Sequence, residues 1–475
     1  MKFNLYFDIT LAFLLLVGSN AHAQENTDFQ AGAAMSVITP PIGTSINGGM
    51  QDRIVSNIHD ETHARAIVLD DGETRLAIVV SDLCMIYRET VDQAKERAHE
   101  FTGIPTENMM MSATHTHSAG TACSVFQSDP DPEYLEFLSE RIADAVIRAN
   151  ENRVPARIGW GFGQEPDQVH NRRWLLKPGK TSPNPFGGED LARMNPGVNN
   201  PDKLEPAGPT DPEVSVVSVV AKTGEPIAIL ANYSLHYVGG TGGPVISADY
   251  FGMFNDRMAQ LLNATNQEIP FVSIMSNGTS GDINNIDFSG RIKGARGAFV
   301  QMEYVANVVA AEAYKVVQNI TYQDDLKLSS VQEEISVGVR LPNAEEVKRA
   351  EEIMAHAEGP NMKTREEIYA RETVLIQHYP DEVEMILQAF RIGDLAIAAI
   401  PCEVFVEIGL DLKENSAVKP MFTISLANGY FGYLPTPKHH ALGGYETWRA
   451  RSSFLEVNAS VKISETMFDL LKQLK

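Results

Sequence analysis

Short apolar runs and stretches with helical apolar spacing alternate along the first third of the chain. Residues 75–80 and 109–113 are almost continuously apolar, which is typical of buried strands. Residues 90–101 and 134–150 are predicted as helices, and within 134–150 the apolar positions recur every three or four residues on one face. This alternation predicts an α/β fold in which mixed central β-sheet layers are flanked by helices.

The same patterns continue through the rest of the chain. We expect strands at 214–220, 227–233, 271–275, 383–391, 395–400 and 423–427, and helices near 250–262, 300–318 and 343–356. The segment 177–212 is rich in Pro, Gly and Asn, and it is predicted as a long surface loop near the site, not as a domain boundary. The hydrophobic content suffices for one large domain or two, and the lack of a boundary favours a single domain over residues 24–475.

Residues 1–23 are predicted to be a signal peptide. Lys2 precedes the apolar stretch 9–17, and Ala21-His-Ala23 is a small-residue pattern that suits cleavage after Ala23. The apolar stretch is too short to span a bilayer comfortably, and no later segment offers about 18 uncharged apolar residues. We therefore expect no transmembrane segment and an exported protein, periplasmic or secreted in a bacterium.

The charge of the chain limits which partners it can bind, and its cysteine content limits the role of disulfide bonds. The chain has 62 Asp and Glu against 39 Lys and Arg, a formal net charge of −23. Such an excess of carboxylates repels phosphate backbones and argues against a nucleic-acid partner. The three cysteines, Cys84, Cys123 and Cys402, form an odd set, so at most one disulfide can form and no disulfide framework holds the fold.

Three metal-ligand side chains share one kind of position, at or just beyond the end of a predicted strand. They are His115, His236 and Glu403. If these strands lie side by side, their ends meet at one edge, and two imidazoles with one carboxylate make the open three-ligand set of a catalytic zinc site. Calcium and magnesium prefer oxygen ligands only, so zinc suits this set better.

A second imidazole, His117, lies two residues after His115. Alternation along an extended chain places both rings on one side, which suits one metal ligand and one neighbour that touches substrate. Each residue also has an ordinary structural interpretation: a histidine at a strand end often bonds the backbone or a carboxylate, and the nearby tyrosines, Tyr430, Tyr433 and Tyr445, often serve as packing.

Several motifs occur in the order in which a known family carries them. They are Thr114-His-Thr-His117, Ser234-Leu-His236, Pro401-Cys-Glu403-Val-Phe, and Tyr430-Phe-Gly-Tyr433 followed by Tyr445-Glu446. In this set the chain resembles the neutral ceramidases, zinc amidases that hydrolyse the amide of N-acylsphingosine. The resemblance covers most of the chain after the signal peptide, which makes it far more specific than any single motif.

The resemblance implies roles for individual residues. His115, His236 and Glu403 would hold Zn²⁺ with Tyr433 as the fourth ligand, and the ion would lower the pKa of a water from about 15.7 toward about 7. His117 would lie near the substrate carbonyl, whose oxygen Arg172 helps to hold. Tyr445 would be a substrate-facing phenol. Asp249 and Asp282 would either orient the ligand histidines or cap turns.

The chain also departs from the family pattern. Asn284 stands where the ceramidases have a serine, which excludes a covalent acyl-enzyme there and leaves its amide to orient substrate. His440 replaces a tyrosine, so it is a candidate, with Tyr445, for the acid that protonates the leaving amine. The chain ends 30 residues beyond Tyr445, so we expect no immunoglobulin-like C-terminal domain.

The leading prediction is a secreted zinc amidohydrolase that cleaves an N-acyl bond in a small-molecule or lipid acyl amide such as ceramide. One alternative keeps the metal chemistry and is a carbohydrate-directed zinc deacylase or esterase. Another, from a different class, is a non-catalytic zinc- or lipid-binding protein. The sequence leaves the acyl group and the oligomeric state open.

Overall fold

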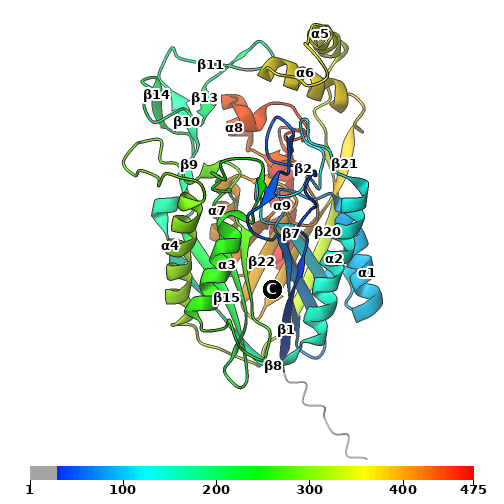
Figure 1. Ribbon diagram of the computed structural model, residues 1–475, viewed down its shortest axis with the longest axis vertical. Coiled ribbons are helices and arrows are strands. Elements are labelled where there is room, and N and C mark those ends of the chain that lie inside the picture. Colours follow the sequence, from blue (N-terminus) through cyan, green and yellow to red (C-terminus); the bar gives the residue numbers. More distant parts are fainter. Residues whose placement is uncertain (1–28) are drawn as a thin grey trace, which may run out of the picture.

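Two β-sheets packed face to face form the centre of the computed structural model, which describes residues 29–475 (Figure 1). The predicted signal peptide, residues 1–23, lies outside the described residues. The larger sheet has eight strands in the order β18-β16-β15-β8-β1-β5-β6-β7. These strands are β1 (Gln30–Val37), β5 (His63–Asp70), β6 (Arg75–Ser81), β7 (Met109–Ala113), β8 (Val154–Gln164), β15 (Glu213–Ala221), β16 (Pro226–Tyr233) and β18 (Val272–Asn277).

The second sheet has four strands in the order β20-β21-β22-β24. Its strands are β20 (Leu328–Gly338), β21 (Glu382–Ile392), β22 (Leu395–Ile400) and β24 (Met421–Ser425). Most neighbours in the two sheets are antiparallel, and the parallel pairs are β6–β7, β16–β18 and β22–β24. Each parallel pair is joined through a helix, as a crossover connection requires. The predicted mixed α/β fold is therefore confirmed.

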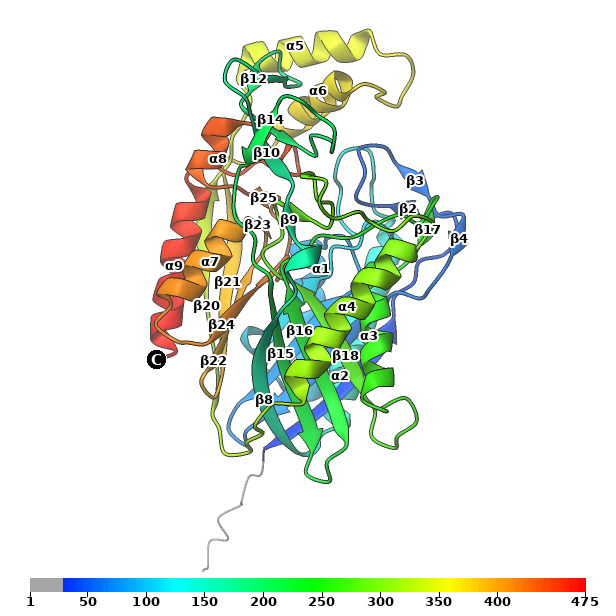
Figure 2. The same cartoon turned by 90° about the vertical axis from the view of Figure 1, so that its left-hand side faces the viewer.

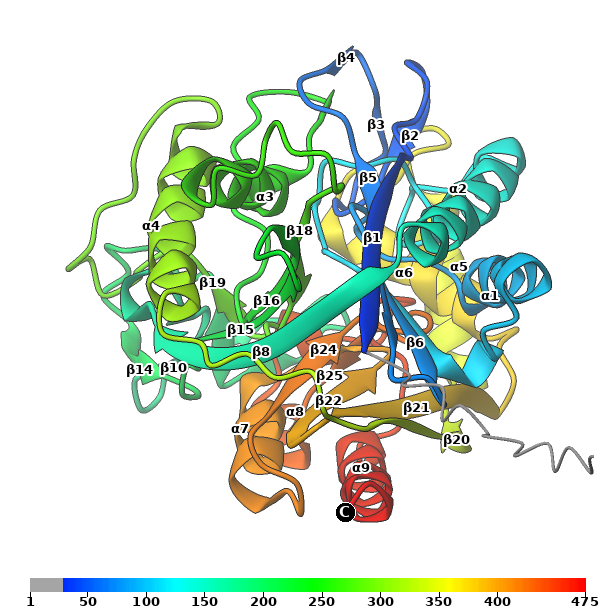
Figure 3. The ribbon, with the colours of Figure 1, turned by 90° about the horizontal axis from the view of Figure 1, so that it is seen from below.

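The interior between the sheets is built from apolar side chains that alternate along the strands. Leu69, Phe390 and Phe422 belong to this layer, and each is almost fully buried. Helices cover the outer faces (Figure 3): α1 (Arg88–Thr102) and α2 (Pro132–Glu151) pack on one half of the large sheet, and α3 (Asp249–Leu261) and α4 (Val300–Val317) on the other. Helices α7 (Val406–Asn415) and α9 (Ala459–Gln473) cover the smaller sheet.

Local sequence explains the start and orientation of helix α2. The Asp131 side chain accepts a hydrogen bond from the Glu133 amide at 2.9 Å, and Pro132 occupies the first turn, where its missing N–H costs nothing. Leu138, Ile142 and Val146 form the buried stripe that faces the sheet. None of the helices between residues 29 and 475 combines the length and the apolar content that spanning a bilayer requires.

The segment 177–212 differs from the predicted long loop, because it contains short strands. They are β11 (Ser182–Pro183), β12 (Glu189–Asp190), β13 (Ala192–Met194) and β14 (Lys203–Pro206), of which β13 and β14 flank β10 (Arg173–Leu176). Strands of only two to four residues are held together by backbone hydrogen bonds. They therefore produce no recognisable pattern of apolar residues in the sequence. Together with α5 (Ala344–Ala355), α6 (Arg365–Ile376) and α8 (Pro437–Leu442), the segment forms a cap above the two sheets (Figure 2).

Candidate metal centre

The three candidate ligands come from strands that are not neighbours, so the condition considered from the sequence, that these strands lie side by side, is not met. His115 follows β7, which is one edge of the large sheet, and His236 follows β16, next to the opposite edge. Glu403 follows β22 of the smaller sheet and begins the short strand β23 (Glu403–Val404).

Hydrogen bonds between the strand ends bring these segments together. The Asn277 amide at the end of β18 donates to the Thr114 carbonyl at 3.0 Å, and the Ala113 amide donates to the Leu426 carbonyl at 3.2 Å. The two edges of the large sheet thus meet beside the end of β24. The ends of β7, β18 and β24 therefore form one shared rim, although β7 and β18 stand at opposite ends of the strand order of the large sheet.

At this rim the side chains of His115, His236 and Glu403 converge. The Nε2 atoms of His115 and His236 are 3.0 Å apart, and His115 Nε2 lies 3.1 Å from Glu403 Oε2. The distance from His236 Nε2 to the same carboxylate oxygen is 3.8 Å. Ligand atoms on one tetrahedral zinc ion are separated by about 3.3 Å, because Zn–N distances are about 2.0–2.1 Å. All three residues are buried.

The backbone fixes which nitrogen of each imidazole carries a proton. His115 Nδ1 lies 2.7 Å from the Cys84 carbonyl oxygen, and His236 Nδ1 lies 3.0 Å from that of Ser280. A carbonyl oxygen only accepts, so each Nδ1 is the donor and each neutral ring presents a lone pair at Nε2. Neither Asp249 nor Asp282 orients these rings.

Burial and charge act on these groups in different directions. Burial lowers the pKa of His236 well below its ordinary value, and the nearby Arg172 lowers it further. Burial lowers the pKa of His115 too, but the facing Glu403 carboxylate and Cys84 together more than offset this, and the pKa lies well above the ordinary value. Glu403 Oε2 is buried without a hydrogen-bond partner. One proton on His115 can satisfy only one of its neighbours, whereas a divalent cation satisfies both Nε2 atoms and the carboxylate oxygen at once.

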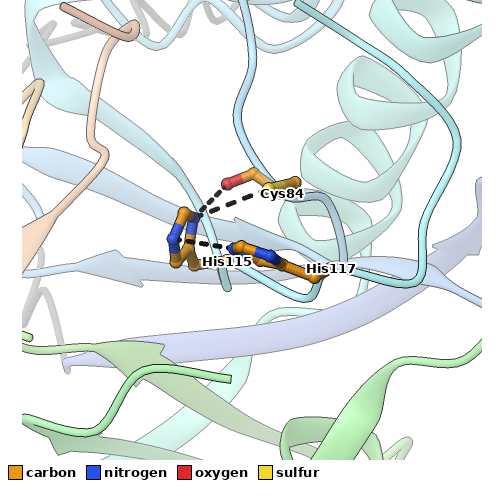
Figure 4. A group of neighbouring side chains, drawn as sticks. All are labelled: Cys84, His115 and His117. Atoms are coloured by element: carbon orange, nitrogen blue, oxygen red, sulfur yellow. Dashed lines mark hydrogen bonds between the residues drawn. The ribbon is translucent and has the colours of Figure 1, made fainter. Parts of the chain in front are cut away.

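His117 extends the cluster, but not by the alternation expected of an extended chain. Strand β7 ends at Ala113, and His115 has a positive φ of 75°, a strained conformation for a residue with a side chain. The turn nevertheless brings His117 Nε2 to 3.1 Å from His115 Nε2. Figure 4 shows the two rings with Cys84 beside His115. The His117 ring stacks on Tyr237 at a centroid distance of 3.6 Å, and its Nδ1 is buried without a hydrogen-bond partner.

Two tyrosines contact or adjoin the carboxylate. Tyr430 Oη donates to Glu403 Oε1 at 2.8 Å, a contact that sequence reasoning missed because it assigned Tyr430 to packing. Tyr433 lies opposite Glu403 in the parallel pairing of β23 with β25 (Tyr433–Leu434). Its phenol oxygen accepts a hydrogen bond from Arg172 Nη2 at 3.0 Å. Burial raises the pKa of Tyr433 well above its ordinary value, and the Glu403 charge raises it further.

Arg172 is held by a buried network around Glu446. Its Nε donates to Glu446 Oε1 at 2.8 Å, and its Nη2 donates to the Gly281 carbonyl at 2.8 Å. Arg173 Nη1 donates to the other oxygen of Glu446 at 2.6 Å. The carboxylate therefore balances two buried guanidinium groups. The Tyr445-Glu446 motif was the sequence signal that could have identified Glu446, but from the sequence a role was assigned only to the tyrosine.

The remaining predicted residues have other contacts. The Asn284 amide donates to the Asn195 side chain at 2.9 Å, and its oxygen accepts from the Ile286 amide at 2.9 Å. His440 lies on α8, where burial, with Arg340 and Arg173, lowers its pKa to about 4 and keeps the ring neutral. Asp249 and Asp282 both accept backbone amide hydrogen bonds, and Asp282 also accepts from Asn171 at 2.7 Å.

A pocket of about 350 Å³ adjoins the cluster. Tyr445 lines it and contacts the Tyr433 ring at a centroid distance of 5.7 Å. Asn195, another lining residue, donates its amide to the Arg172 carbonyl at 2.8 Å. The strands of the cap supply much of the wall, as expected for a segment predicted to lie near the site.

The three free thiols do not form a further reactive set. Cys84, Cys123 and Cys402 are all buried and unpaired. The sulfur of Cys84 lies 3.8 Å from His115 Nδ1. Burial raises the pKa of this thiol, which disfavours the reactive thiolate form. Its contribution to the cluster is the backbone carbonyl that fixes the His115 tautomer.

Known proteins share this fold and part of this sequence. No protein-family model matches the chain. Neutral ceramidase A of Dictyostelium discoideum is 24% identical over 297 residues, which cover 58% of this chain and 38% of the relative. Neutral ceramidase of Pseudomonas aeruginosa is 24% identical over 243 residues, 48% of this chain and 33% of the relative. The chain thus matches only about a third of the length of these relatives.

Solved structures extend the likeness to nearly all of the chain. The crystal structure of the neutral ceramidase from Pseudomonas aeruginosa matches with a TM-score of 0.70 at 18% identity, over 95% of this chain and 75% of that one. A ceramidase complexed with C2 matches equally well, with a TM-score of 0.70 over 94% of this chain. The predicted resemblance is therefore confirmed: in part of its sequence and in its fold, this chain is similar to the neutral ceramidases.

Proposed function

We propose that this chain is a zinc-dependent amide hydrolase that cleaves an N-acyl bond. The observation that supports it best is the set of three buried acceptor atoms, His115 Nε2, His236 Nε2 and Glu403 Oε2, which face one another without enough protons to pair them. The donor set of two imidazoles and a carboxylate is typical of catalytic zinc. Tyr433, beside Glu403, is the proposed fourth ligand.

Zinc at this position would lower the pKa of a water to about 7 and polarise the acyl oxygen. The chain's own residues would then position the amide. Arg172, fixed by Glu446 and the Gly281 carbonyl, is proposed to hold the oxygen on which negative charge develops, together with His117. A well-aimed donor of this kind contributes about 3 kcal/mol to transition-state stabilisation.

The leaving amine needs a proton, for which Tyr445 at the pocket wall is the proposed donor. Asn284 cannot serve as a nucleophile, so water attacks directly and the products are a free carboxylate and an amine. The ceramidase relatives support ceramide or a related N-acyl lipid as the substrate class. An exported, periplasmic or secreted location remains part of this proposal.

Metal analysis combined with an activity assay tests the proposal. We expect about one zinc per chain in the purified protein, and its loss in Glu403→Gln. The same protein should release fatty acid from ceramide in vesicles but no acetate from acetylated glycans, and His115→Ala should abolish the release. Acetate release instead would favour a carbohydrate deacylase. Zinc binding with no product from either substrate would favour a binding protein.

A further inference from the structure

The wall of the pocket beside the metal centre is cationic in a strongly acidic protein. Arg193, from β13, and Arg365, from the first turn of α6, both line it. No Asp or Glu lines it, although the chain has 62 of them against 39 Lys and Arg. Among the described residues neither arginine forms an ion pair with a carboxylate. Two uncompensated guanidinium groups at one pocket favour an anionic ligand.

Apart from Ser182 and Asn195, the rest of the wall is apolar or aromatic. Met50, Met194, Tyr445 and Trp448 contribute to it. The Arg365 side chain is exposed, and its guanidinium lies over the Trp448 ring, 5.2 Å from the centroid, so a cation–π contact holds the charge at the pocket wall. The Trp448 Nε1 in turn donates to the buried Asp190 at 2.7 Å, which fixes the ring under the arginine.

The pocket shares its walls with the metal centre on more than one side. Tyr445 contacts Tyr433, the proposed fourth ligand, and Asn195 is bonded to the backbone of Arg172. Met50 comes two residues after Gly48, against which the His117 ring packs. A ligand bound in this pocket therefore reaches both the two arginines and the residues that contact the metal centre.

We propose that the substrate of this site carries an anionic group, such as a sulfonate or carboxylate, on the side of the amide that occupies this pocket. This inference rests on the proposed amide hydrolase function and adds a preference within its substrate class: acidic N-acyl conjugates are cleaved faster than neutral amides such as ceramide. Arg365 and Arg193 bind the anionic group, and the apolar wall binds the carbon chain beside it. The guanidinium fork is suited to this task, because it presents paired N–H donors to planar or tetrahedral oxyanions.

Matched substrates that differ in one terminal group test the inference. N-dodecanoyltaurine and N-dodecanoylethanolamine have the same acyl chain and amide, but the first ends in a sulfonate and the second in a neutral hydroxyl. N-dodecanoylglycine tests a carboxylate. With the zinc-loaded full chain we expect kcat/KM to be about 10-fold to 100-fold higher for the anionic amides. Arg365→Gln should remove most of this ratio, and Arg365→Lys should retain part of it.

Arg349→Gln is the matched control, because Arg349 lies in the same helical cap but pairs with Glu366 and lines a different pocket. It should leave the ratio unchanged. Equal kcat/KM for the neutral and anionic amides would overturn the inference and leave the hydrolase function standing. If no amide is cleaved, calorimetric binding of N-dodecanoyltaurine decides: binding that weakens at least tenfold in Arg365→Gln supports the anion site, and no binding refutes it.

Discussion

His115 and His236 face each other through Nε2 atoms 3.0 Å apart, while each Nδ1 donates to a backbone carbonyl. Two such lone pairs repel unless a cation lies between them. We therefore expect zinc to stabilise the folded protein, by about 4 kcal/mol when free zinc exceeds its Kd a thousandfold. Tm measured with increasing zinc should rise for the native chain and stay constant for His236→Ala. His356→Ala, an exposed control, should respond like the native chain; a Tm independent of zinc would contradict the metal site.

Gly48 and Gly43 offer a matched pair of substitutions. Both have a φ of 97°, but a Cβ on Gly48 would lie 2.3 Å from His117 Cγ, whereas nothing lies within 4 Å of one on Gly43. Both alanine variants should lose stability through backbone strain, by about 1 kcal/mol or more. Only Gly48→Ala should displace the imidazole and lower kcat, by at least about tenfold. Equal kcat values in the two variants would show that the position of His117 does not matter.

Tyr430 should affect metal affinity without being a ligand. Its phenol donates to Glu403 Oε1, and the loss of partners that orient a metal ligand typically costs about 10-fold to 100-fold in affinity. We expect Tyr430→Phe to weaken zinc binding by this factor in a competition assay with a fluorescent chelator, while one zinc still binds at saturation. Tyr87→Phe, which removes a partly buried phenol bonded to the Ser124 amide, is the control and should leave zinc affinity unchanged.

Glu446 should be essential for both stability and activity. It pairs with Arg172 and Arg173 in a fully buried setting, and removing one partner of such a network costs about 3–5 kcal/mol. Urea unfolding of Glu446→Gln should show this loss, and hydrolysis should fall because Arg172 loses its anchor. Glu366→Gln removes an exposed pair with Arg349 and should cost less than about 1 kcal/mol. Equal losses in the two variants would refute the buried network.

His439 should make the protein less stable in mild acid. Burial, together with the charges of Arg173 and Lys438, lowers its pKa from the ordinary value of 6.5 to about 3. Between pH 6.5 and 3 the unfolded chain binds a proton that the folded chain does not, so stability falls as pH falls through this range, by at most about 1.4 kcal/mol per pH unit for this one group. In urea unfolding between pH 7 and 4.5, His439→Gln should show a shallower decline than the native chain. His356→Gln should show the native slope; the same slope in both variants would contradict the assignment.

Much of the fold was predictable where apolar periodicity was strong. The helices at α2 and α4 and the strands at β15, β16 and β22 lie close to their predicted positions, because each is fully or half buried and has a continuous apolar pattern. Strand β8 was missed since Gly159, Gly161 and Gly163 interrupt its pattern. A Cβ on any of them would meet α4 or the residues after it within 3 Å, so the glycines serve the close packing of helix on sheet.

The candidate ligand residues could be selected from the sequence because polar side chains follow buried strands, but the way they come together could not be predicted. The sequence indicates that His115, His236 and Glu403 each stand at the end of a strand, yet it does not show that these strands belong to two sheets. Nor does it show that backbone carbonyls of Cys84 and Ser280 select the tautomers, since a carbonyl has no sequence signature. The role of Tyr430 was hidden for a related reason: a packing tyrosine and a donor to Glu403 look the same in sequence.

Because both edges of the large sheet meet at one rim, we expect the proposed metal centre to form late in folding. No two adjacent strands in the sheet order carry two of the three candidate ligands, so a partly folded chain offers no preformed chelate. Zinc uptake should therefore coincide with completion of the native state, and a refolding experiment followed by a zinc indicator would register only the final, concerted closure of the molecule.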